Sequence, residues 1–159
     1  MRLKFLMDED FINYKKPSMF IGFPSCSFKC CKEGGFPIEV CQNNALTKAP
    51  NIEVSVNSLI ERYMNNSLTQ AVVCGGMEPF DSWEDLQCFI MNFRYWSNDD
   101  VVIFTGYNKE EIQDKIEWLK LYGPIIIKFG RFIPNQQPHY DEVLGIKLAS
   151  DNQYAEVIS

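Results

Sequence analysis

Short apolar runs separated by amphipathic segments constrain the fold of this chain more than any other feature. The runs lie at residues 19–23, 71–74, 101–104 and 125–129, with a further strand expected at 145–149. They do not alternate apolar with polar residues, as a strand with one solvated face would. Strands of this kind are buried on both faces, which is typical of a parallel sheet covered by helices.

Three segments between these runs have helical periodicity. Helices are predicted over about 57–66, 82–95 and 108–119, and both Ser82-x-x-Asp85 and Asn108-x-x-Glu111 resemble a capping box. Together they predict an α/β fold with a largely parallel, open sheet of about five strands. A closed eight-stranded barrel is excluded by length, which leaves a small partial (β/α) barrel or a short doubly wound sheet.

Length and charge exclude several other classes of protein. The 159 residues predict one domain spanning 1–159. The net charge of −6 and the lack of a basic block argue against nucleic acid or a membrane surface as partner. No run approaches the roughly 18 apolar residues of a membrane span. The N-terminus turns acidic before a signal peptide could form. We therefore expect a cytoplasmic protein.

Four of the six cysteines lie within sixteen positions, directly after the first predicted strand. They are Cys26, Cys30, Cys31 and Cys41. In a reducing cytosol this clustering indicates metal binding or catalysis rather than disulfides. Three thiolates would leave one iron of a four-iron cluster open, whereas a closed zinc site wants four ligands. Residues 32–53 are predicted to form a long loop, which in a compact domain is usually functional.

Unusual residues follow each of the other predicted strands as well. Because the carboxyl ends of parallel strands meet at one edge, they are expected to converge there. A Gly-Gly turn exposes backbone groups to a ligand, and the nearby Glu78 offers a carboxylate to an ammonium group. The candidate binding residues are Gly75, Gly76, Glu78, Thr105, Lys128, Arg131 and Asn152.

These motifs resemble a known enzyme superfamily. Cys26 and Cys30, followed after the second strand by Gly75-Gly76-Met77-Glu78-Pro79, resemble the radical S-adenosylmethionine (SAM) enzymes. Later segments at 104–107, 130–133 and 150–153 resemble the activating protein of anaerobic (class III) ribonucleotide reductase. The resemblance spans about residues 18–155.

The resemblance implies a specific chemistry. Three cysteines would hold a [4Fe–4S] cluster that chelates the amino and carboxylate groups of SAM. One-electron reduction would then cleave SAM to methionine and a 5′-deoxyadenosyl radical. The partner would be a glycyl radical enzyme, anaerobic ribonucleoside-triphosphate reductase, which loses a glycine hydrogen atom to that radical. An electron donor such as flavodoxin or ferredoxin is implied as well.

The resemblance also implies roles for the candidate binding residues. Lys128 or Arg131 would face the methionine carboxylate. Thr105 and Asn152 are candidates for contacts to the ribose or the carboxylate. The residues implied to lie at the methionine amino group are Gly75, Gly76 and Glu78.

The cysteine spacing departs from the family pattern, which is Cys-x3-Cys-x2-Cys. The position three beyond Cys30 is occupied by Glu33. We expect Cys26, Cys30 and Cys41 to be the ligands, with the intervening segment an insertion. The rival set replaces Cys30 by Cys31, because adjacent cysteines can hardly both ligate one cluster.

Two other functions remain open from the sequence. One is a small radical SAM enzyme that acts on a small molecule, like 7-carboxy-7-deazaguanine synthase. The other is a non-enzymatic adaptor that binds zinc or an iron–sulfur cluster structurally. The unusual cysteine spacing leaves room for a diverged relative with another substrate.

Overall fold

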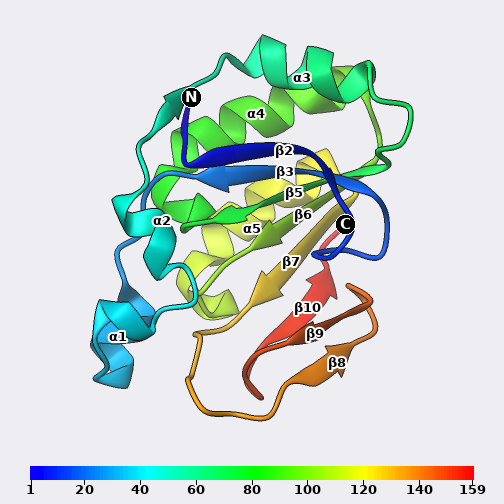
Figure 1. The fold of residues 1–159 in the computed structure, drawn as a ribbon. Coiled ribbons are helices and arrows are strands. Elements are labelled where there is room, and N and C mark those ends of the chain that lie inside the picture. The colour runs from blue at the N-terminus through cyan, green and yellow to red at the C-terminus, as the bar shows by residue number, and fades with distance from the viewer.

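A six-stranded, mostly parallel sheet organises the fold in the computed structural model, which describes residues 1–159 (Figure 1). The strand order is β10-β7-β6-β5-β3-β2. Four neighbouring strands are parallel, and the two edge strands are antiparallel to their neighbours. The parallel strands are β3 (Ser18–Phe23), β5 (Ala71–Gly76), β6 (Asp100–Phe104) and β7 (Ile125–Phe129). The edge strands are β2 (Phe5–Asp10) and β10 (Tyr154–Val157).

The helices between the parallel strands lie on one side of the sheet (Figure 1). They are α3 (Val56–Met64), α4 (Trp83–Trp96) and α5 (Gln113–Leu119). The parallel strands lie in the sheet in chain order, so each crossover runs the same way and places its helix on the same face. The predicted α/β class and mostly parallel sheet are therefore confirmed. A doubly wound sheet, with helices on both faces, is not what forms.

The helix starts differ in how they are capped. The predicted capping box at Asn108 is present, with Glu111 bonding back to the Asn108 amide at 2.8 Å. It caps a short 3₁₀ turn, η3 (Lys109–Ile112), that leads into α5. The second predicted box is absent, because the Ser82 side chain makes no capping bond at the start of α4. A 3₁₀ turn, η2 (Pro79–Ser82), precedes this helix instead.

Side chains from alternate positions of each parallel strand enter two separate cores. In β3, Met19, Ile21 and Phe23 point into the main cluster of 21 buried residues, which the helices complete. Phe20 lies in a cluster of 8 on the opposite face. Because both faces are covered, the strands are apolar at consecutive positions, as the sequence predicted.

The face without helices is covered in part by a small hairpin. It consists of β8 (His139–Asp141) and β9 (Ile146–Leu148), which pair with each other and not with the main sheet. The predicted strand at 145–149 is therefore wrong as the last strand of the sheet. That place is taken by β10, which runs back along β7.

The region predicted as a long loop, 32–53, contains short elements instead. A helix α1 (Lys29–Gly34) is followed by a 3₁₀ turn η1 (Ile38–Val40) and a helix α2 (Asn44–Lys48). A two-residue strand β4 (Ile52–Glu53) then pairs with β1 (Arg2–Leu3). Elements of two to six residues are too short to show a period in the sequence.

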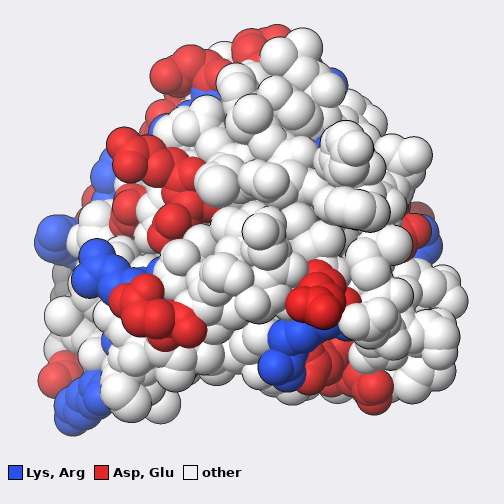
Figure 2. Space-filling model, turned by 90° about the horizontal axis from the view of Figure 1, so that it is seen from above, with Lys and Arg blue, Asp and Glu red and all other residues white.

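Charged side chains are spread over the surface in small groups. Figure 2 shows acidic and basic groups of this kind around a broad uncharged area on the face seen from above. No helix is both long enough and apolar enough to cross a membrane.

Candidate functional site

A cavity of about 410 Å³ lies where the carboxyl ends of the parallel strands meet the face without helices. Its wall includes residues of the segment 24–49, which carries the four clustered cysteines and which we call the cysteine loop. The wall also includes residues at the ends of β5, β6 and β7 and in the β9 strand. The elements predicted to converge at one edge therefore do so, and they enclose a space.

Three of the four clustered cysteines line this cavity. They are Cys26, Cys30 and Cys41. Cys31 is buried and is not part of the cavity wall. The backbone N–H of Phe28 donates to Cys26 Sγ at 3.3 Å. No three Cys, His, Asp or Glu side chains lie close enough together to coordinate one metal ion.

The protein environment alone does not favour thiolates at Cys26 and Cys30. Burial raises the pKa of Cys26 to about 12, opposed by the Phe28 N–H. Burial also raises the pKa of Cys30, opposed by the Phe132 N–H and by the charges of Arg131 and Lys128. A bound metal would supply the positive charge that deprotonates them, because metal binding releases thiol protons.

Residues 25–28 of the cysteine loop are tied to the end of β5. The Glu78 amide donates to the Ser25 carbonyl at 2.8 Å, and the Ser27 amide donates to Asp81 Oδ2 at 2.6 Å. The Tyr107 hydroxyl donates to the other oxygen of Asp81 at 2.6 Å. Phe28 then takes a left-handed conformation with φ 55° as α1 begins. The place of Cys26 is thus set by the turns after β5 and β6.

Both predicted glycines lie at the end of β5, but only one of them lines the cavity. Gly76 lines the cavity, with φ +78°, and a Cβ there would lie 2.9 Å from the Gly22 Cα. Only glycine fits this conformation and this close approach without strain. Gly75 is not in the cavity wall, and its Cα faces the ring of Phe20. The structure places a third glycine, Gly106, against Cys30, where a Cβ would lie 3.0 Å from Sγ.

Glu78 is buried in the cavity wall and is held by protein donors. Its Oε1 accepts from the Phe80 amide at 3.1 Å and from the Thr105 hydroxyl at 2.8 Å. Its Oε2 accepts from the Gly106 amide at 2.8 Å. A carboxylate has about four acceptor sites, so about one remains for a ligand. Burial raises the pKa of Glu78 to about 7, opposed by these bonds. Thr105 lines the cavity, but its hydroxyl is used to join the ends of β5 and β6.

Lys147 is the exposed cation of the cavity wall, and Lys128 is the buried one, which has no carboxylate partner. The Lys128 amine makes one long hydrogen bond, 3.4 Å to the Gly130 carbonyl. Burial lowers its pKa to about 8, opposed by the nearby Glu78 and Cys30. A buried ammonium with so few partners is suited to binding an anionic group.

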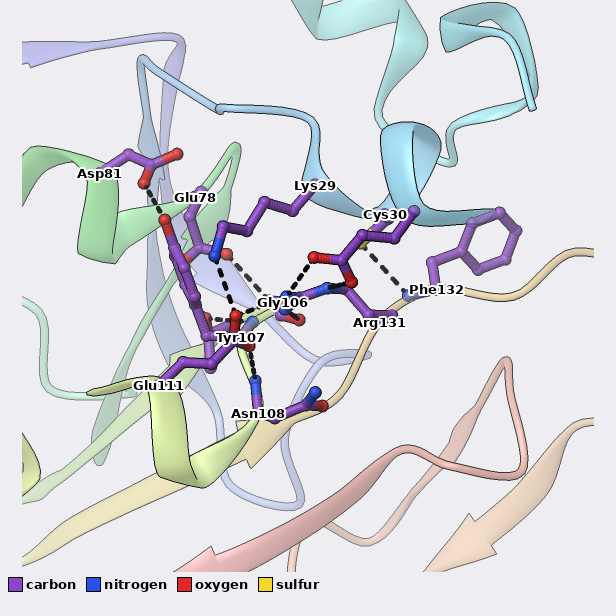
Figure 3. A network of polar contacts seen from close by, with 12 residues as sticks. Lys29, Cys30, Glu78, Asp81, Gly106, Tyr107, Asn108, Glu111, Arg131 and Phe132 are labelled. Atoms are coloured by element: carbon purple, nitrogen blue, oxygen red, sulfur yellow. Dashed lines mark hydrogen bonds and ion pairs between the residues drawn. The ribbon is translucent and has the colours of Figure 1, made fainter. Parts of the chain in front are cut away.

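Arg131 and Asn152 have protein partners and do not line the main cavity. The Arg131 guanidinium binds Glu33, and it binds Glu111 as well (Figure 3). Burial lowers the pKa of Arg131, but the two carboxylates raise it by more. The pKa of Arg131 therefore lies above its ordinary value. Asn152 Nδ2 donates to the Arg131 carbonyl at 2.9 Å. Of the two predicted carboxylate-binding cations, Lys128 is therefore the one in the cavity.

The sequence prediction missed several residues of this site. Gly106 and Gln153 line the cavity, and the Phe132 amide donates to Cys30 Sγ at 3.4 Å (Figure 3). All three lie beside residues that were singled out, within the segments 104–107, 130–133 and 150–153. The sequence feature that could have identified them is their position just after a strand, and not the chemistry of their side chains.

No family model matches the chain, and searches of curated proteins and of solved structures found no match either.

Proposed function

We propose that this protein is a radical SAM enzyme whose cavity holds a [4Fe–4S] cluster on Cys26, Cys30 and Cys41. The observation that carries the proposal is that three cysteines, and not four, line one cavity at the carboxyl ends of parallel strands. A three-thiolate set leaves one iron of a cubane cluster for a substrate. A closed zinc site would need a fourth ligand. The remaining clustered cysteine, Cys31, lies against Cys41 but is buried outside the cavity wall.

The residues around the cysteines suit a cluster of this kind. Backbone N–H groups of Phe28 and Phe132 donate to Cys26 and Cys30, and hydrogen bonds to the sulfurs tune the reduction potential of such clusters. When bound and reduced, the cluster would supply the electron that cleaves SAM to methionine and a 5′-deoxyadenosyl radical.

The other cavity residues would bind and orient the SAM molecule. Lys128, the buried cation of the cavity wall, has no ion pair and would bind the methionine carboxylate. The backbone at Gly76 and the remaining acceptor site of Glu78 would receive the amino group. Apolar side chains such as Phe20 and Phe104 would exclude water from the reacting bond.

The proposed substrate is a glycine residue of a glycyl radical enzyme. The enzyme that the proposal favours is an anaerobic ribonucleoside-triphosphate reductase. The fold would be a partial (β/α) barrel, with helices outside and the cavity on the inner face. Four parallel strands form only half of an eight-stranded barrel, so a large partner would complete the walls. A cytoplasmic donor such as flavodoxin or ferredoxin would reduce the cluster.

The deciding experiment is anaerobic reconstitution with iron and sulfide. We expect a brown protein with about four iron and four sulfide per chain, which makes 5′-deoxyadenosine from SAM in the presence of dithionite. Cys88→Ser is a matched control, because Cys88 is exposed and outside the cavity wall. Tight zinc binding without SAM cleavage would instead support the adaptor function. Incubation of the active protein with a candidate reductase should then give a glycyl radical by electron paramagnetic resonance.

A further inference from the structure

The helix that carries Cys30 is too short to hold its own position. The α1 helix has six residues, no side-chain N-cap bond and one buried residue, Cys31. Isolated helices shorter than about 12 residues are marginal in water. The place of Cys30 must therefore come from contacts between α1 and the rest of the fold.

Four charged residues make those contacts, and we call them the ionic clasp: Lys29, Glu33, Glu111 and Arg131. Glu33, near the end of α1, accepts from Arg131 at 2.9 Å and 3.1 Å. Lys29, at the start of α1, binds Glu111 at 2.9 Å. Arg131 binds the same Glu111 oxygen at 2.7 Å (Figure 3). One end of α1 is thus bonded to the Arg131 guanidinium directly, and the other end is linked to it through Glu111, with Cys30 between them.

Arg131 is the central member of the ionic clasp. It also donates to the Gly106 carbonyl, so it binds the turn after β6 as well. Its side chain is 10% exposed, and both its guanidinium and the Lys29 amine lie over the Tyr107 ring. The next residue, Phe132, donates its amide to Cys30 Sγ. A planar guanidinium can make this set of forked bonds, whereas a lysine amine cannot.

We propose that Arg131 is a positioning residue, which acts through the ionic clasp to hold α1 against the strand ends and so fixes Cys30 at the cavity. This assigns it a role other than binding the SAM carboxylate. The clasp itself is independent of the proposed function. Only its consequence for metal binding rests on that function.

The test compares amide hydrogen exchange in the metal-free wild type, Arg131→Gln, Arg131→Lys and Glu33→Gln. In Arg131→Gln, we expect the hydrogen-bonded amides of residues 28–36 to exchange about tenfold faster or more, because a largely buried charged partner is lost. Amides of β5 should exchange as in the wild type. In Arg131→Lys, the exchange rate of these amides should lie between those of the wild type and Arg131→Gln. The lysine keeps the positive charge but cannot make the forked bonds of the guanidinium. Glu33→Gln should raise exchange in the same residues.

The matched control is Arg62→Gln, which removes a two-bond contact to Asp8 on the exposed surface. It should leave exchange at 28–36 unchanged. Equal exchange at 28–36 in Arg131→Gln and the wild type would overturn the proposal. Faster exchange throughout, β5 included, would also overturn it, because Arg131 would then stabilise the fold in general.

A second measurement separates this inference from the proposed function. After reconstitution, Arg131→Gln should lose iron to a chelator about tenfold faster than the wild type, because one ligand is less well positioned. Unchanged iron release would overturn the positioning role. If the wild type binds no iron at all, the proposed function fails, and the exchange measurement still decides whether the ionic clasp positions α1.

Discussion

The two halves of the cysteine loop differ sharply in how the fold holds them. The anchored segment, residues 24–34, is bonded to the turns after β5, β6 and β7, through Asp81, Glu111 and Arg131. The tethered segment, residues 36–49, carries Cys41 and has no buried residue. Its amides bond almost only within the loop. Its contacts to the rest include a bond from Lys4 to the Ala49 carbonyl and a ring contact between Phe36 and Phe132. Figure 1 shows α1 and α2 of these two segments beyond the strand ends.

This difference suggests how the site would assemble. Cys26 and Cys30 are held by the sheet before any metal arrives, because their segment is bonded to three strand ends. Cys41 comes from a segment with few long-range contacts, and such segments open locally at low cost in free energy. We infer that the metal would bring Cys41 to the other two cysteines.

Single cysteine changes should give the largest effect. Cys26→Ala and Cys30→Ala should each lose most of the reconstituted iron and sulfide, since each removes an anchored ligand. Cys41→Ala should lose it too, because a cluster needs three thiolates from this chain. Cys31→Ala should keep the cluster, because Cys31 is outside the cavity wall. Iron content and the visible absorption of the cluster are the measurements. Loss of the cluster in Cys31→Ala together with its retention in Cys30→Ala would instead support the rival set of Cys26, Cys31 and Cys41.

Matched threonine changes compare the stability that the strand ends and the tethered segment contribute. Thr105→Val breaks a buried bond of 2.8 Å to Glu78, and should lower the free energy of unfolding by about 1–3 kcal/mol, because polar groups stay buried without partners. Thr47→Val breaks a bond of 2.7 Å to the Asn44 carbonyl within α2. It should cost about 0.5 kcal/mol or less. Urea unfolding measures the free energy of unfolding of each variant. Equal losses in the two variants would contradict the difference between the strand ends and the tethered segment.

Amide exchange in the metal-free protein should show the contrast directly. Protected amides of the tethered segment should exchange about tenfold faster than those of the anchored segment, because fewer contacts must break to expose them. Reconstitution should slow exchange in the tethered segment more than in the anchored one. If both segments exchange at the same rate before and after reconstitution, the inferred order of assembly is wrong.

The smallest expected effect is on the pH dependence of stability. Arg131 lowers the pKa of Glu111 to about 2, from an ordinary value of 4.5. A carboxylate with a depressed pKa contributes stability that is present above its unfolded pKa and lost as the pH falls toward its folded pKa. The difference in unfolding free energy between wild type and Arg131→Gln should therefore narrow between about pH 4.5 and 2. The change should be on the order of 1 kcal/mol or less, because the pair is partly exposed. Urea unfolding of both proteins across this pH range measures the change. If the difference in unfolding free energy stays constant, the Arg131–Glu111 ion pair does not stabilise the fold as inferred.

Much of the fold could be predicted from the sequence because its signals are local. The buried strands β3, β5, β6 and β7 appear as apolar runs, and the helices between them show their own period. Parallel order then follows from the alternation of the two kinds of element. The collection of unusual residues at the strand ends follows from that order in turn. These inferences need only neighbouring residues and the general geometry of parallel sheets.

The tertiary structure alone decided which residues in these segments meet. Strand β10 and the β8–β9 hairpin are short, and their pairing depends on distant strands rather than on local pattern. Arg131 and Glu33 are 98 positions apart, so no local pattern could assign this arginine to a protein carboxylate instead of a ligand. Cys30 and Cys31 are neighbours with the same chemistry, and only the packing of α1 places one at the cavity and buries the other. Residue types thus indicated the chemistry, whereas long-range packing and ion pairs selected the residues that would carry it out.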